Sequence, residues 1–408
     1  MTLQTALSGL LGAQTGLNTV ANDLANASTT AFKSQTALFA DVYPANQSKV
    51  AGIGVASSAI SSDFTQGGLV STGNPLNAAI QGSGFFVVSA NGQQQYTRDG
   101  SFSLNPSGQL VTSNGATVLG YSQNTNGTLS ASLSPITVNT GALAANATSN
   151  LGLTLNLNSA DASIPATTTF NPADPTTYNE STSVVAYDSL GNANRVGLYF
   201  TQNPAASATA APVWSVYAQP QNVSGAAIGT PQLLSNLAFS NTGALTSGSP
   251  ATLNVTWGNG ASNAAIQFNF TGTTLGAQNF AVAGTTNNGY PPGNYSGTTI
   301  SSSGALMSNY SNGQTVRAGN LSLANFINQN GLQSVSGNLF ASTQTSGQPV
   351  LDIPGTGEAG LISGGSLEQS NASTSSLLVS LIQYQQAYQA NTSVIQTEQQ
   401  DGTRLTQI

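Results

Sequence analysis

The sequence has very little charge and lacks two residue types entirely. Of its 408 residues, only 6 are Lys or Arg and 13 are Asp or Glu, and there is no His and no Cys. Because six scattered cations cannot build the basic surface that binds a phosphate backbone, nucleic acid is not an expected partner. Without His and Cys, the usual general base near neutral pH, the usual zinc ligands and any disulfide are excluded.

Long apolar runs are missing as well. No stretch of 18 apolar residues occurs, even in the uncharged segment between Arg195 and Arg317, so no membrane insertion is expected. The amino terminus has neither the basic region nor the continuous apolar core of a secretory signal peptide. An uncharged, cysteine-free surface suits an extracellular protein, which would then need an export route without a cleaved signal peptide.

Both ends of the chain show helical periodicity. Apolar residues recur in steps of three and four from Leu3 to Leu24, which predicts a helix of about 25 residues that ends within 26–30. A similar stripe lies near the carboxy terminus, where neither Pro nor Gly interrupts residues 366–401. The two helices can form an antiparallel pair. A pair alone leaves apolar surface in water, so it would dock either on the chain's own β domains or on the same helices of neighbouring copies.

If the helices pack on neighbouring copies, the residues of the two stripes form the subunit interface. The predicted interface residues are Leu3, Leu7, Leu10, Leu17, Leu24 and Asn26 in the first helix, and Leu377, Leu381, Tyr384, Tyr388, Asn391 and Ile395 in the second.

The middle of the chain has the pattern of antiparallel β structure. Short strand-like runs are separated by turn pairs such as Asn91-Gly92, which favour hairpins. Two more hairpins are expected, within 183–201 and within 253–270, and segments 140–149 and 283–292 are interpreted as linkers. The predicted fold is therefore mainly β with α-helical termini. Its nested parts are a helical coiled-coil pair (1–30 with 366–408), an extended or β linker region (31–75), a β domain (76–145 with 283–365) and an inserted outer β domain (146–282).

No motif predicts catalysis or a cofactor. The segment 355–360 matches a dinucleotide-binding GxGxxG pattern, but Pro354 precedes it and no helical pattern follows, which indicates a loop. The nearest groups of carboxylates lie in turn-like sequence, where solvated acids are the ordinary case: Asp161 with Asp174 and Glu180, and Asp352 with Glu358. We expect no enzyme activity, no metal and no cofactor.

Several short motifs follow one another along the two ends of the chain. They are Ala6–Leu10, Val20–Asn26, Thr30–Lys33, Gln66–Leu69, Thr72–Leu76, Ile80–Phe86, Tyr96–Phe102, Leu367–Asn371 and Tyr388–Asn391. In kind and order these motifs resemble the bacterial flagellar rod and hook proteins. Two positions depart from the family pattern, because Ala31 stands where Gly is usual and Gln386 where Arg is usual.

The resemblance implies a structural subunit that assembles helically with copies of itself into a hollow tube whose bore is lined by the terminal helices. Within the family, the uncharged insertion points to the hook, a curved tube that acts as a universal joint and transmits motor torque to the filament. Implied partners are the rod and hook–filament junction proteins, the hook cap and the flagellar type III export apparatus. The implied location is the extracellular hook and basal body. Two alternatives stay open: a distal rod subunit, and a secreted adhesive or carbohydrate-binding β protein.

Overall fold

The computed structural model describes residues 2–43, 52–124, 126–205 and 212–405. The chain forms two compact units. The first comprises Met1–Thr140, Gly297–Asn309 and Thr315–Ile408, and the second comprises Gly141–Ser296 and Tyr310–Gln314. Strands make up most of the regular structure, with one long helix at each end of the chain, so the predicted mainly β fold with helical termini is confirmed.

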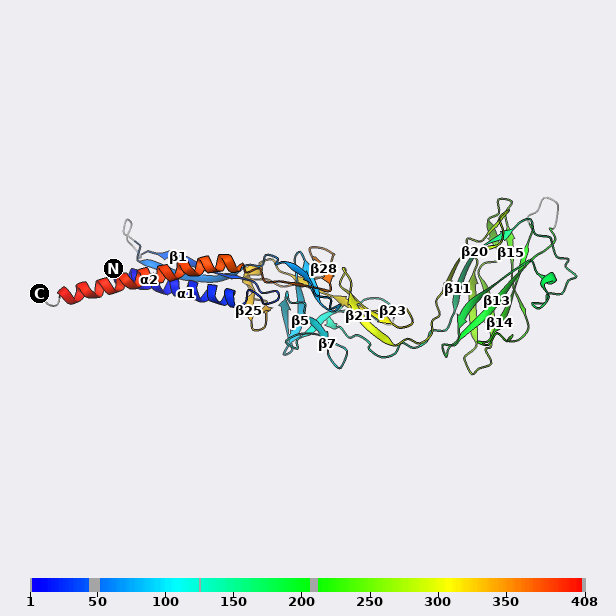
Figure 1. Ribbon diagram of the computed structural model, residues 1–408, viewed down its shortest axis with the longest axis horizontal. Helices are drawn as coiled ribbons and strands as arrows, with labels where there is room; N and C mark the ends of the chain where they lie inside the picture. The colour runs from blue at the N-terminus through cyan, green and yellow to red at the C-terminus, as the bar shows by residue number, and fades with distance from the viewer. Residues whose placement is uncertain (1, 44–51, 125, 206–211, 406–408) are drawn as a thin grey trace. The chain divides into compact units, whose positions relative to one another are not determined.

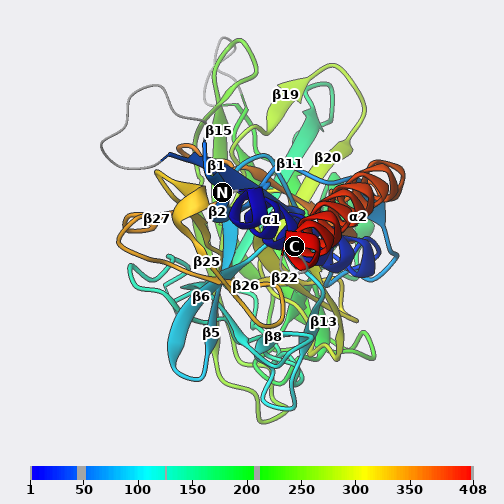
Figure 2. The same ribbon diagram turned by 90° about the vertical axis from the view of Figure 1, so that its left-hand side faces the viewer.

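The two long helices of the first unit are α1 (Thr2–Ala25) and α2 (Thr374–Leu405), which pack side by side (Figures 1 and 2). Gly9 lies against Asn391 and Gly16 against the ring of Tyr384, so the helices run antiparallel, as the sequence predicts. Since this register places the start of α1 near residue 398, the last turns of α2 extend beyond α1 (Figure 1). None of the helices among the described residues is long and apolar enough to cross a membrane.

The buried face of α1 is built from small residues rather than from leucines. Its buried positions are Ala6, Gly12, Ala13, Gly16, Thr19, Val20 and Asp23. A face without large side chains lets the backbone of α1 approach its neighbours closely, and large rings such as that of Tyr384 fill the space from α2. The leucine stripe of α1 therefore lies on other sides of the helix, because the chain's own packing selects the small residues.

A two-stranded ribbon covers another side of α1. It consists of β1 (Gln35–Val42) and β2 (Gly54–Ser62), paired antiparallel. Gly12 of α1 packs against Val55 and Phe39 of the ribbon, and the Val55 N–H donates to Ser8 Oγ at 3.2 Å. The ribbon and α2 thus hold α1 from two sides.

The rest of the first unit is one large, mostly antiparallel sheet and two small ones. The large sheet contains β5 (Phe85–Ala90), β6 (Gln93–Thr97), β7 (Phe102–Leu104), β8 (Leu110–Thr112), β9 (Thr117–Ser122), β10 (Ser134–Pro135), β21 (Tyr295–Ile300), β22 (Ala305–Tyr310), β23 (Thr315–Leu321), β24 (Leu323–Asn325), β25 (Gln333–Val335), β26 (Leu339–Ala341) and β27 (Val350–Asp352). The small sheets pair β4 (Ala78–Gln81) with β28 (Leu361–Gly364) and β3 (Leu69–Ser71) with β29 (Ser366–Glu368). A short 3-10 helix, η2 (Gln329–Gly331), precedes β25.

Aromatic side chains form a core of this sheet. Phe85, Tyr96, Phe326 and Phe340 pack edge to face, with ring centroids 4.8 to 6.0 Å apart. The hairpin between β5 and β6 turns at Asn91-Gly92, where both residues have positive φ values of 53° and 77°. This is the geometry that an Asn-Gly pair favours, and it confirms the predicted turn.

The second unit is a sandwich of two five-stranded sheets. One contains β11 (Asn150–Asn158), β17 (Ala251–Val255), β18 (Ala264–Asn269), β19 (Thr274–Gly276) and β20 (Ala281–Asn287), and the other β12 (Glu180–Tyr187), β13 (Ala193–Gln202), β14 (Trp214–Gln221), β15 (Gln232–Phe239) and β16 (Leu245–Ser247). Alternate residues of both sheets share one core. A 3-10 helix, η1 (Pro175–Thr177), is capped by the Asp174 side chain.

Two sequence expectations for this unit are confirmed and one is wrong. The predicted hairpins are present as β12–β13 and β17–β18. Residues 283–287, however, belong to strand β20 and pair antiparallel with β11 instead of forming a linker. Every residue of β20 is exposed, so this edge strand shows no apolar alternation that would have marked it as a strand.

Candidate assembly surface

A buried charge cluster lies where the helix pair meets the β structure of the first unit. Glu368, at the end of β29, accepts from Lys33 Nζ at 2.7 Å and from the Gly67 N–H at 2.9 Å through Oε1. Its other oxygen, Oε2, accepts from Arg98 Nη1 at 3.4 Å. All three charged side chains are almost fully buried. The cluster therefore joins the segment after α1, the turn after β6 and the segment before α2.

Backbone acceptors complete this cluster. Lys33 Nζ also donates to the Thr65 carbonyl at 2.7 Å, and Arg98 Nη2 donates to the Gly82 carbonyl at 2.8 Å. Burial lowers the pKa of Lys33, while the hydrogen bond and charge of Glu368 raise it in part. Burial likewise lowers the pKa of Arg98. One carboxylate thus holds two cations in a dry site, and its loss would leave neither cation with an ion-pair partner among the described residues.

The Asn371 side chain and one backbone hydrogen bond fix the segment between α1 and β1 beside this cluster. Asn371 accepts from the Ser34 N–H at 2.8 Å and donates to the Asp63 carbonyl at 2.8 Å. Ala31 is buried, donates its N–H to the Glu368 carbonyl at 2.8 Å, and has a left-handed φ of 55°. Glycine adopts this conformation without the steric cost of a Cβ, which gives a physical reason for the Gly of the related motif at this position.

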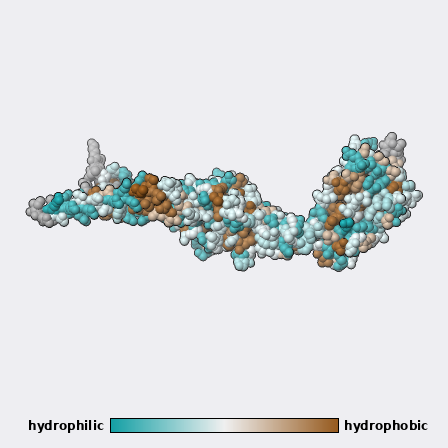
Figure 3. All heavy atoms as spheres, in the orientation of Figure 1, coloured by the Kyte–Doolittle hydropathy of each residue, from teal (hydrophilic) through white to brown (hydrophobic). Residues whose placement is uncertain are grey.

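Large apolar side chains project outward from the helix pair and its ribbon. We call this set the outward apolar surface, and it comprises Leu3, Leu7 and Leu11 of α1, Leu378, Val379, Ile382 and Val394 of α2, and Leu38 and Ile60 of the ribbon. Leu378, Val379 and Ile382 are 49%, 57% and 52% exposed. Figure 3 shows an apolar patch over the first turns of α2. A contiguous patch of this kind is typical of an interaction surface.

The predicted interface residues fall into two groups. Leu3 and Leu7 are exposed and belong to the outward apolar surface. The others are half-buried: Leu10, Leu17, Leu24, Asn26, Leu377, Leu381, Tyr384, Tyr388, Asn391 and Ile395. Of these, Tyr384 and Asn391 pack against glycines of α1. Their role between copies stays a prediction. The predicted stripes do not include four exposed residues, Leu11, Leu378, Val379 and Ile382. Three of them lie directly beside a residue of a predicted stripe and Val379 lies two positions from one, and this position was the only signal for them in the sequence.

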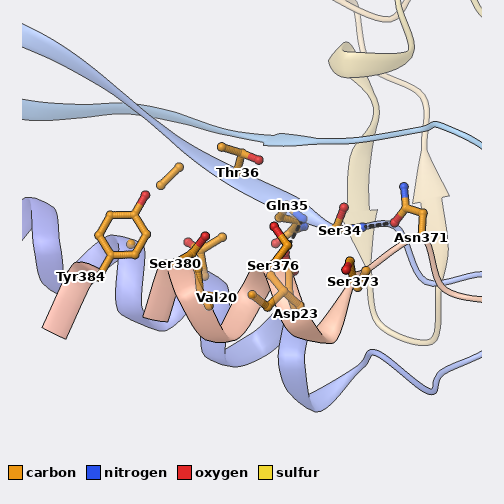
Figure 4. Close-up of a pocket in the computed structure, with 15 residues that line it drawn as sticks. Val20, Asp23, Ser34, Gln35, Thr36, Asn371, Ser373, Ser376, Ser380 and Tyr384 are labelled. Carbon is orange, nitrogen blue, oxygen red and sulfur yellow. Dashed lines mark hydrogen bonds between the residues drawn. The ribbon is translucent and has the colours of Figure 1, made fainter. Parts of the chain in front are cut away.

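A small polar pocket of about 260 Å³ lies between α1, β1 and α2 (Figure 4). One of its lining residues is Asp23, which is only 1% exposed. Asp23 Oδ2 accepts from the Gln35 N–H at 2.8 Å, whereas Oδ1 has no hydrogen-bond partner among the described residues. Burial raises the pKa of the Asp23 carboxyl, and the hydrogen bond from Gln35 opposes this shift. Among the described residues, no cluster of three or more metal-ligating side chains is present.

Three family models match successive parts of the chain. They are the flagellar hook protein FlgE/F/G D1 domain at residues 79–153, the flagellar basal body protein FlaE D2 domain at 156–290, and the flagellar basal body rod FlgEFG protein C-terminal region at 363–408. Together with paired terminal helices that bear an outward apolar surface, these matches define a structural subunit of the flagellar rod and hook class.

Full-length relatives narrow this class. The chain is 37% identical to the flagellar hook protein FlgE of Salmonella typhimurium over 98% of each chain, and 32% identical to that of Brucella suis over 97% of this chain and 95% of the relative. The chain therefore belongs to the flagellar hook protein family and is a subunit of the hook. A crystal structure of the Helicobacter pylori flagellar hook protein FlgE2 shares the fold, with a TM-score of 0.55 and 15% identity over 74% of this chain and all of that one.

Proposed function

We propose that this hook subunit assembles helically into a hollow, curved tube that works as a universal joint between the motor and the filament. In this proposal the helix pairs of neighbouring copies pack together and line the bore. The observation that carries it is the outward apolar surface, because Leu378, Val379 and Ile382 are half-exposed on a helix that is otherwise ordered. Burying a large aliphatic side chain contributes about 1.5–3 kcal/mol, so these residues favour burial between copies.

The low charge supports the mechanical part of the proposal. Between Arg195 and Arg317, which includes most of the second unit, there is no charged residue. Charges buried between subunits would have to lose their water, which is costly unless they are paired in good geometry. Hydroxyl and amide side chains can exchange partners as neighbouring copies slide during rotation. A surface of this kind suits contacts that lengthen and shorten once per turn.

The double substitution Leu378→Gln with Ile382→Gln tests the assembly surface. We expect the concentration needed for polymerisation to rise at least about tenfold, since two large apolar side chains are lost from the contact. Electron microscopy and sedimentation measure tube formation, and circular dichroism checks that the helices remain folded. The matched control is Leu190→Gln, which alters an equally exposed leucine in a turn of the second unit. Normal tubes from the double variant would contradict the proposal.

We further infer that the subunit leaves the cell through the flagellar type III export apparatus and then meets the hook cap and the rod and junction proteins. Membership of the flagellar hook protein family supports this route. In cells that lack the export apparatus, the chain should stay inside. In wild-type cells the mass of the exported chain should show no cleavage of a signal peptide. Secretion without that apparatus would refute the route.

A further inference from the structure

The Asp23 pocket contains an acidic group whose Oδ1 has no hydrogen-bond partner among the described residues. Its wall is polar, with hydroxyls from Ser34, Ser376 and Ser380 (Figure 4). Among the described residues that line it, Asp23 is the only carboxylate and none is a cation. A buried carboxylate oxygen without a hydrogen bond is costly. A hydrogen-bond donor that entered this pocket from outside would relieve that cost.

The cations of the described residues leave few candidates for this donor. Lys33 and Arg98 are held by Glu368, and Arg317 donates to Asn320 at 2.6 Å. Arg195 is exposed on β13 and belongs to the second unit, whereas the proposed assembly joins copies through the helix pairs of the first unit. Arg404, in the last turn of α2, is exposed and forms no ion pair within the described part of the chain. Its only evident local role is the weak stabilisation that a cation gives to the carboxyl end of a helix.

Arg404 cannot reach the pocket of its own chain. It lies 28 residues beyond Ser376 on α2, and a rise of 1.5 Å per residue separates the two by about 42 Å. The last turns of α2 also extend past the start of α1, so Arg404 lies at the free end of the helix pair. A second copy displaced by about 42 Å along the helix axis would bring its Arg404 beside the pocket.

We propose that the Asp23 pocket binds the Arg404 guanidinium of a neighbouring copy and so sets the axial offset between the two helix pairs. This inference rests on the proposed assembly through the helix pairs and adds a specific contact to it. A guanidinium has five N–H donors, which can satisfy the unpaired Asp23 oxygen and the nearby serine hydroxyls together. The apolar contacts would supply most of the attraction, and this pair would fix the register.

Cross-linking tests the contact directly. The chain has no Cys, so each introduced cysteine is the only one in its molecule. We would mix a Ser376→Cys variant with an Arg404→Cys variant, assemble them and add a short bismaleimide. A cross-linked dimer is expected from assembled tubes and not from dispersed subunits. The matched control uses Gln389→Cys in place of Arg404→Cys. Gln389 is also exposed on α2, but it lies about 22 Å from residue 404 along the helix. No dimer, or a dimer with Gln389→Cys alone, would overturn the proposal.

A charge cycle gives a second, independent readout. Asp23→Asn and Arg404→Gln should each raise the critical concentration about tenfold or more, and the double variant should be no worse than the more severe single variant. Lys49→Gln, which changes a cation outside the described residues, should leave it unchanged. Purely additive effects, no effect, or an effect of Lys49→Gln in place of Arg404→Gln would overturn the pairing. If the wild-type chain forms no tubes at all, the proposed assembly fails and not merely this contact.

Discussion

Replacing Glu368 with Gln should destabilise the first unit and leave the second unchanged. The substitution keeps the shape of the side chain and removes the one ion-pair partner that Lys33 and Arg98 have among the described residues. Lys33 keeps only the weaker electrostatic effect of Asp63. Breaking a buried ion pair costs about 3–5 kcal/mol, because an uncompensated charge stays buried. Each cation keeps one backbone acceptor, the Thr65 or Gly82 carbonyl. We therefore expect the lower end of this range, a loss of about 3 kcal/mol.

The sequence itself provides separate reporters for the two units. Its two tryptophans, Trp214 and Trp257, are both buried in the core of the second unit. The long helices α1 and α2 both belong to the first unit. In a urea titration of the dispersed full chain, circular dichroism at 222 nm therefore follows the first unit and tryptophan fluorescence the second. The fluorescence transition should move by less than about 0.5 kcal/mol.

The control for this variant is Glu358→Gln, which makes the same chemical change at an exposed turn. It should alter neither transition by more than about 0.5 kcal/mol. Because Lys33 in the Glu368→Gln variant loses the partner that raises its pKa, the folded state should release that proton more readily than the unfolded state. The stability deficit should then shrink as the pH rises toward the unfolded pKa of Lys, about 10.4. A helix-transition loss below about 1 kcal/mol, or an equal shift in fluorescence, would refute the reasoning.

Two further predictions concern α1. Gly16→Val should lower the stability measured by the helix transition by about 1–3 kcal/mol, because the valine side chain would overlap the Tyr384 ring. The control Gly402→Ala should cause no such loss, because a Cβ at that position meets open space. Equal losses for both variants in a urea titration would refute the packing of Gly16 against Tyr384. Asp23→Asn should stabilise the dispersed subunit at pH 7. Because burial raises the pKa of Asp23, its ionised form destabilises the folded state once the pH rises above the unfolded pKa and through the folded pKa. The gain in stability of the Asp23→Asn variant should therefore vanish below about pH 4. Thermal melts with an equal gain at pH 3.5 and pH 7 would contradict this.

Local signals in the sequence were sufficient for the two helices, several hairpins and the family, but not for strand β20. The periodic leucines and the uninterrupted carboxy-terminal segment predicted two long helices, and both are present as α1 and α2. The Asn91-Gly92 pair predicted a tight turn, because few residues other than Asn and Gly accept two successive positive φ values. Signals of this kind depend on residues close together in the chain, so they can be recognised without knowledge of the tertiary structure.

The sequence by itself determined the class of protein, the helical ends, the hairpins and the near absence of charged chemistry. Only the tertiary structure decided which side of α1 is buried, because glycines and alanines carry no apolar signal until a ring such as that of Tyr384 is known to face them. It likewise decided that Lys33, Arg98 and Glu368 meet, although the first and last are 335 positions apart. It also left Asp23 buried with one unpaired oxygen. Contacts between distant segments depend on the tertiary fold of the whole chain, so they cannot be predicted from the spacing of residues along the sequence.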